Sequence, residues 1–230
     1  MKPIRSASRG FTLVELLVVI MIVLVLAVLA FTGARRFIEN AKKTQAMAQF
    51  RDLKVGLTML EVDYGKPPIP SNKRVGGWDT IYGDPGGYYE NGYIVATLAG
   101  EEGEFNFDSG VTFLVRESNP RLEHYITFPL AENGKSGVDK NGNLLDPWGN
   151  QVIMAVNAFA AEGKSITEFN SGSNDRRLHT WGLAEYNETK PRDQSFVFWS
   201  YGKDGKKGDN APNPGDVVSL KKSDDVVSWY

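Results

Sequence analysis

The amino-acid sequence predicts an α+β fold in which one long N-terminal α-helix, half transmembrane and half amphipathic, packs on a small antiparallel β-sheet head with a long C-terminal loop. Two observations predict the helix. Residues 16–34 are apolar and uncharged, and residues 35–64 carry apolar side chains at helical spacing. A third observation predicts the sheet, because two segments between residues 151 and 201 are rich in β-branched and aromatic residues.

The uncharged run is long enough to cross a bilayer. As a helix, residues 16–34 would be about 28 Å long, close to the roughly 30 Å hydrocarbon core of a membrane. A secretory signal has a shorter apolar core with its cleavage site on the far side, whereas here the basic residues Lys2, Arg5 and Arg9 precede Gly10 and the apolar run follows it. The positive-inside rule then places the leader in the cytoplasm and the C-terminal head outside it.

One carboxylate, Glu15, lies near the start of the apolar run. Deep in a membrane and without a partner it would cost on the order of 3 kcal/mol. Cleavage after Gly10 would create a positively charged α-amine on Phe11, and in a bundle of such helices Glu15 of one subunit could pair with the Phe11 amine of its neighbour. The alternative is that Glu15 lies at the headgroup level and reaches water.

Residues Gly10 to Ile20, GFTLVELLVVI, closely resemble the N-terminal signature of type IV pilins and type II secretion pseudopilins. The resemblance implies that a prepilin peptidase cuts between Gly10 and Phe11, that Phe11 is N-methylated, and that Glu15 guides filament assembly. It implies a homopolymer assisted by an assembly platform and minor pseudopilins. It also implies a single-pass protein of the bacterial inner membrane that becomes a periplasmic or surface filament.

The second half of the long helix should lie on the sheet. A run of proline and glycine, Gly65, Pro67 and Pro68, should end this helix, because proline lacks the amide proton and clashes with the preceding turn. Its apolar stripe is spaced 4, 3, 4, 3, 4 along one face and consists of Ala46, Phe50, Leu53, Leu57, Leu60 and Tyr64.

Five segments follow from these boundaries. They are a leader peptide (1–10), a transmembrane and filament-core helix (11–34), the amphipathic half of the helix (35–65), a variable loop-rich insertion (66–145) and a β-sheet head whose C-terminal loop resembles a calcium-binding loop (146–230).

Short elements leave alternatives open. Residues 93–98 could form a helical turn, while residues 111–115 and 125–128 could be strands or a buried helix segment, since periodicity cannot decide at this length. Residues 151–156 and 195–201 are bounded by turns and predict antiparallel strands.

Three further segments resemble the major, G-type pseudopilins. Residues 146–150, DPWGN, resemble a turn of that group, residues 200–205 resemble the start of its C-terminal calcium loop, and residues 225–229 resemble the end of that loop. Two departures stand out, because this loop is longer than usual and Ser223 occupies the place of the first closing aspartate.

The resemblance implies a structural calcium ion, which takes six to eight oxygen ligands. The expected ligands are Asp204, Asp225 and a backbone carbonyl near Tyr201, with Asp224 and Asp209 as further candidates. The alternative is a solvated acidic loop.

Composition disfavours other function classes. The chain has two histidines, His124 and His179, no cysteine, no serine beside a recognisable base and no phosphate-binding glycine loop, so we expect no enzyme. Its net charge of −2 gives no reason to expect nucleic-acid binding. The favoured function is a major-pseudopilin-like subunit that drives protein export by type II secretion. The alternatives are a surface type IV pilin, used for adhesion, motility or DNA uptake, and a membrane-anchored binding module that never polymerises.

Overall fold

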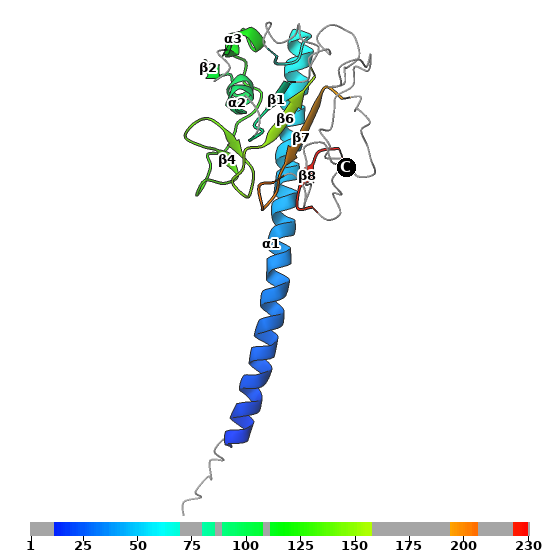
Figure 1. Ribbon diagram of the computed structural model, residues 1–230, viewed down its shortest axis with the longest axis vertical. Coiled ribbons are helices and arrows are strands. Elements are labelled where there is room, and N and C mark those ends of the chain that lie inside the picture. Colours follow the sequence, from blue (N-terminus) through cyan, green and yellow to red (C-terminus); the bar gives the residue numbers. More distant parts are fainter. Residues whose placement is uncertain are drawn as a thin grey trace, which may run out of the picture. The chain divides into compact units, whose positions relative to one another are not determined.

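The computed structural model describes residues 12–69, 80–85, 89–107, 111–157, 194–206 and 223–229. The chain divides into two compact units, Met1–Ala41 and Lys42–Tyr230, which are treated separately below. Figure 1 shows the elements along the chain.

Helix α1 spans Leu13–Tyr64, which confirms the predicted long helix. By length and composition its N-terminal part could cross a membrane. The helix ends as expected, because Gly65 adopts a left-handed conformation (φ 64°) that few other residues accept and two prolines follow.

Within the second unit, α1 contributes one side of the main core. The predicted stripe is buried there, and Tyr64 at its end is half-buried. The ring of Phe50 stacks on that of Phe198 with centroids 6.2 Å apart, so α1 packs against one face of the central sheet. The fully or almost fully buried members of the stripe are Ala46, Phe50, Leu53, Leu57 and Leu60.

The central sheet has four antiparallel strands in the order β1-β6-β7-β8 (Figure 1). Both of its faces are buried, which explains the nearly continuous apolar sequence of its middle strands. The face toward α1 includes Met154, Val156 and Phe198, and the opposite face includes Trp199. The strands are β1 (Thr80–Tyr82), β6 (Ile153–Val156), β7 (Phe196–Ser200) and β8 (Val226–Val227).

The range 66–145, expected as a loop-rich insertion, contributes directly to this core. Strand β1 pairs with β6, and helix α2 (Gly92–Ala99), which includes the expected turn at 93–98, is buried along almost its whole length. The other elements are β2 (Glu104–Phe107), β3 (Val111–Leu114), α3 (Val115–Ser118), β4 (Gly137–Val138) and β5 (Leu144–Leu145).

Two short segments adopt conformations that differ from the alternatives expected from the sequence. Residues 111–115 form a strand and then enter a helix, because β3 pairs with β2 and α3 begins at Val115. Residues 125–128 form neither a strand nor a helix, so both alternatives were wrong. The backbone there is held instead by Leu98, whose carbonyl accepts hydrogen bonds from the amides of Tyr125 (2.9 Å) and Ile126 (3.1 Å).

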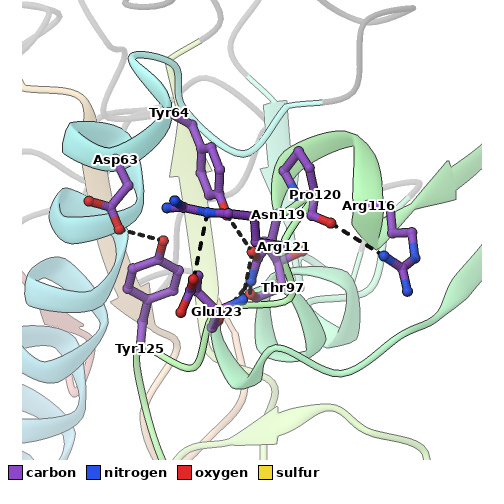
Figure 2. Close-up of polar contacts among 9 residues, drawn as sticks. All are labelled: Asp63, Tyr64, Thr97, Arg116, Asn119, Pro120, Arg121, Glu123 and Tyr125. Atoms are coloured by element: carbon purple, nitrogen blue, oxygen red, sulfur yellow. Dashed lines mark hydrogen bonds and ion pairs between the residues drawn. The ribbon is translucent and has the colours of Figure 1, made fainter.

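A polar cluster fixes the C-terminal end of α1 (Figure 2). The buried Asn119 donates through Nδ2 to the carbonyls of Thr97 (2.9 Å) and Glu123 (2.8 Å). Its Oδ1 accepts from the Tyr64 hydroxyl and from the Glu123 amide, both at 2.9 Å. The Tyr125 hydroxyl donates to Asp63 at 2.7 Å. Because the Asn119 side chain uses both of its ends, the cluster is a structural clamp on the helix end.

Candidate functional site

The first turn of α1 is closed by a reciprocal pair of side chains. The backbone amide and the hydroxyl of Thr12 both donate to Oε2 of Glu15, at 2.8 and 2.7 Å, and the Glu15 amide donates to the Thr12 hydroxyl at 3.2 Å. This is a capping box, which satisfies free amides at a helix start. The residues expected at the cleavage point, Gly10 and Phe11, lie outside the described residues.

The capping box was missed in reading the sequence, although Thr-x-x-Glu before an apolar run is a sequence signal for it. Its consequence is chemical. The Glu15 carboxylate has two hydrogen-bond donors within its own chain, so a positively charged partner would add to this arrangement or compete with Thr12 for Oε2.

The part of α1 in the first unit has an uncovered apolar surface. Its large apolar side chains between Leu13 and Leu29 are 44 to 80% exposed, the extremes being Leu17 and Leu13. After Glu15 no charged residue occurs before Arg35. Apolar surface on this scale is unusual for a soluble monomer, so this helix requires lipid or other apolar helices around it.

A second cluster of polar contacts centres on the buried carboxylate of Asp146, in the DPWGN turn. Its Oδ1 accepts three backbone N–H groups, from Trp148 at 2.8 Å, Gly149 at 2.7 Å and Asn150 at 2.9 Å. Its Oδ2 accepts the hydroxyl of Ser200, at the end of β7. The carboxylate is fully buried and is satisfied by neutral donors.

Three segments meet around Asp146, and we call them together the Asp146 junction: residues 146–150, 200–204 and Asp224. Asn150 Nδ2 donates to the Gly202 carbonyl at 2.7 Å, and the Asp204 amide donates to Asp224 Oδ2 at 3.0 Å. Gly202 has φ 63°, and a Cβ there would lie 2.5 Å from the Asp224 carbonyl oxygen. This position therefore requires glycine.

The expected metal ligands fall into two groups. Asp204, Asp224, Asp225 and Tyr201 are described, and Asp209 lies outside the described residues. Asp204 Oδ1 accepts the Lys206 amide at 2.8 Å, and the Tyr201 hydroxyl donates to Asp84 at 3.3 Å. Burial, reinforced by the Asp84 charge, raises the pKa of Tyr201, so this phenol stays protonated at neutral pH.

The oxygen atoms near the junction are of the kind that a hard cation binds. The part of the chain that the structure describes nevertheless contains no set of three His, Cys, Asp or Glu side chains placed to hold one. Oδ1 of Asp224 is buried without a hydrogen-bond donor among the described residues. An anionic oxygen in that state is costly unless a positive charge accompanies it. The side chain of Asp225 next to it is also buried.

Comparison with known proteins bears on the N-terminus. Residues 5–31 match the family model described as the prokaryotic N-terminal methylation motif. The match contains Gly10, Phe11, Thr12 and Glu15 and most of the uncharged run. No curated protein and no solved structure matches the chain.

Proposed function

Because this chain carries the N-terminal methylation motif that marks the type IV pilin and pseudopilin family, we propose that it is a structural subunit which polymerises into a filament through α1. The observation that carries the proposal is the motif at residues 5–31, which runs into an apolar helix with an exposed surface. Such a helix leaves lipid at low cost only when other apolar helices replace the lipid.

The assignment to a major-pseudopilin-like protein of type II secretion rests on the head. The turn at 146–150 and the segment at 200–204, each of which resembles that group, lie together in the Asp146 junction. In this role the filament lengthens from the inner membrane and drives protein export, with minor pseudopilins and an assembly platform as partners. A surface type IV pilus is the alternative, and the motif at residues 5–31 suits both.

Two substitutions test the proposal. Gly10→Ala should block cleavage, so the protein would keep its first ten residues, which N-terminal sequencing or intact mass would detect.

Glu15→Ala should insert in the membrane and be processed but should form few filaments, because the carboxylate that pairs with the neighbouring Phe11 amine is gone.

A matched variant separates charge from helix capping at Glu15. Glu15→Gln keeps an oxygen that can accept the Thr12 amide, as in a normal capping box, but it has no charge. We expect this variant to assemble as poorly as Glu15→Ala, as counted by electron microscopy of filaments from cells. Normal filaments from Glu15→Ala would contradict the assembly role.

We also infer that the second unit binds a structural calcium ion, held by Asp224, Asp225 and Asp204 with a carbonyl near Tyr201 and with Asp209 as a further candidate. The buried, donor-free Oδ1 of Asp224 supports this inference. The ion would supply the positive charge that this oxygen lacks and would hold residues 223–225 against the turn at 202–204.

Calcium should raise the melting temperature of the protein, because a ligand that binds only the native state stabilises it, by about 2.7 kcal/mol at a hundred times its Kd. The measurement is a thermal melt in calcium and in chelator. Asp224→Asn should abolish the difference, while Asp139→Asn, in a separate turn, should retain it. An identical melting temperature in calcium and in chelator would contradict the inferred calcium site.

A further inference from the structure

The sequence contains three Asn-Gly pairs, at residues 91–92, 133–134 and 141–142. Asparagine followed by glycine is chemically labile, because the glycine amide nitrogen can attack the asparagine side-chain amide and no Cβ on the glycine obstructs the approach. The same two residue types meet at every pair, so in an unfolded chain the pairs should react similarly. In the folded protein they differ in exposure and in hydrogen bonding, and these differences decide which pair can react.

The Asn91–Gly92 pair is held in the core of the second unit. The Asn91 side chain is fully buried and donates through Nδ2 to the carbonyls of Leu144 and Val152, both at 2.8 Å. Its Oδ1 accepts the Leu144 amide at 2.8 Å. The Gly92 amide donates to Oδ1 of Asn143 at 3.0 Å. Both the attacking nitrogen and the side-chain amide are engaged, so reaction here requires opening of the core.

The Asn141–Gly142 pair is exposed, but its attacking nitrogen is engaged. The Gly142 amide donates to the carbonyl of Asp139 at 3.0 Å, and the Asn141 amide donates to Oδ1 of the same aspartate at 2.8 Å. Ring closure would require the Gly142 amide to leave its acceptor. The loss of one such hydrogen bond should slow the reaction about fivefold relative to an amide without an acceptor.

The Asn133–Gly134 pair combines exposure with an unengaged amide. Both residues are exposed and occupy the central positions of a tight turn, with φ angles of 52° and 70°. The Lys135 amide closes this turn by donating to the carbonyl of Glu132 at 3.1 Å. Neither the Gly134 amide nor the Asn133 side chain has a hydrogen-bond partner among the described residues. A Cβ at Gly134 would meet no atom within 4 Å, so the backbone has open space beside it.

We propose that Asn133 is a site of spontaneous deamidation in the folded protein. The Gly134 amide nitrogen loses its proton to water or hydroxide and attacks Cγ of Asn133, and the bond from Cγ to Nδ2 breaks. The departing nitrogen takes up a proton and leaves as ammonia, so that a succinimide ring remains. Water then adds to one ring carbonyl and opens the ring. Addition at Cγ gives aspartate, and addition at the main-chain carbonyl gives isoaspartate, in which the chain runs through the side chain.

The products change both the charge and the shape of this surface. Asn133 lines a groove of about 790 Å³ that is bordered by α1 and residues 126–136. The charged residues of the groove balance one another and are Lys42, Asp52, Glu132 and Lys135. Either product adds a carboxylate and makes the groove net negative. Isoaspartate also lengthens the backbone by one atom beside the Gly134 carbonyl, which lies so close to Gly149 that a Cβ there would be 2.9 Å from its oxygen.

Peptide mapping by mass spectrometry of the full-length protein in detergent tests the proposal. The folded protein is held at mildly alkaline pH, well below its melting temperature, and each Asn-Gly pair is followed separately over time. We expect aspartate and isoaspartate to accumulate at Asn133 at least about fivefold faster than at Asn141, and neither to form at Asn91. The rate at Asn133 should rise with pH, because the attacking nitrogen must lose its proton.

The same measurement in denaturant is the control for effects of neighbouring residues in the sequence. Unfolding removes the hydrogen bonds that protect Asn91 and Asn141, so the rates at the three pairs should converge. An equally strong preference for Asn133 in the unfolded chain would show that the fold does not cause it, and would overturn the proposal. Equal rates at Asn133 and Asn141 in the folded protein would overturn it too, as would an Asn133 that reacts only after unfolding.

Two matched substitutions assign the change in charge to one residue. Asn133→Gln keeps a side-chain amide, but glutamine must close a larger ring and reacts far more slowly. The reaction involves only the second unit, so these variants test it independently of the proposed filament role. Isoelectric focusing of the aged protein should show an acidic species that is at least about fivefold weaker in aged Asn133→Gln and unchanged in aged Asn141→Gln. An acidic species of equal amount in aged Asn133→Gln would contradict the assignment.

Discussion

At the scale of single residues, the buried carboxylate of Asp146 accepts four hydrogen bonds, so we expect the second unit to be sensitive to its substitution. Alanine there would leave the amides of Trp148 and Asn150 and the Ser200 hydroxyl without their acceptor, while the Gly149 amide would keep its 3.1 Å bond to the Asp146 carbonyl. Each buried group left unsatisfied costs about 1–3 kcal/mol. We expect Asp146→Ala to lower the free energy of unfolding by at least about 3 kcal/mol. Asp146→Asn should cost less, because Oδ1 is retained.

Chemical denaturation would measure these losses. Asp139 provides the matched control, because its Oδ1 also accepts two backbone amides, from Asn141 and Asn143, in a turn that is only half-buried. Water can replace the lost acceptor there, so Asp139→Ala should cost clearly less than Asp146→Ala. Equal losses at the two positions would show that burial of Asp146 has no energetic role.

At the scale of the element, α1 carries one carboxylate that opposes its packing. Burial raises the pKa of Glu61, and a weak hydrogen bond from Ser195 (3.3 Å) only partly offsets it. Because the pKa of Glu61 is higher in the native state than in the unfolded chain, protonation of Glu61 stabilises the fold. This stabilisation is fully present below the pKa of the unfolded chain and is lost as the pH rises through the pKa of the native state.

Glu61→Gln should therefore raise the melting temperature at neutral pH, because glutamine carries no charge to desolvate and still accepts from Ser195. Below about pH 4, where the native carboxyl is already protonated, the gain should disappear. Thermal melts at both pH values would measure this, with Glu101→Gln at an exposed position as the control. A gain that persists at low pH would contradict the assigned cause.

The same scale shows what can be predicted from the sequence. α1 was predictable because its apolar run and its 3-4 spacing repeat over many turns, and β6 and β7 because both their faces are apolar. By contrast, β8 has two residues and exists only through its pairing with Trp199 and Ser200. The contact of Asp146 with Ser200 joins residues 54 apart in the sequence, and no local pattern encodes it.

At the scale of the whole molecule, the two units depend on different surroundings. The N-terminal motif, with its leader and Glu15, was recognisable because it is a local pattern, and the family model matches this part of the chain. The second unit has no disulfide and is held together by its core. Every buried residue of α1 that contributes to this core comes after Lys42.

A chain beginning at Arg35 should therefore keep the fold of the second unit while losing its need for detergent. We expect it to be soluble, because the uncharged run is removed and Ala46, Phe50 and the rest of the buried stripe remain. Circular dichroism and a cooperative thermal melt would check its fold. A chain beginning at Val55 is the control, because it lacks Ala46, Phe50 and Leu53 from the core and should fail to fold. Failure of the Arg35 chain under conditions where the full-length protein melts cooperatively would mean that the core draws stability from the apolar helix.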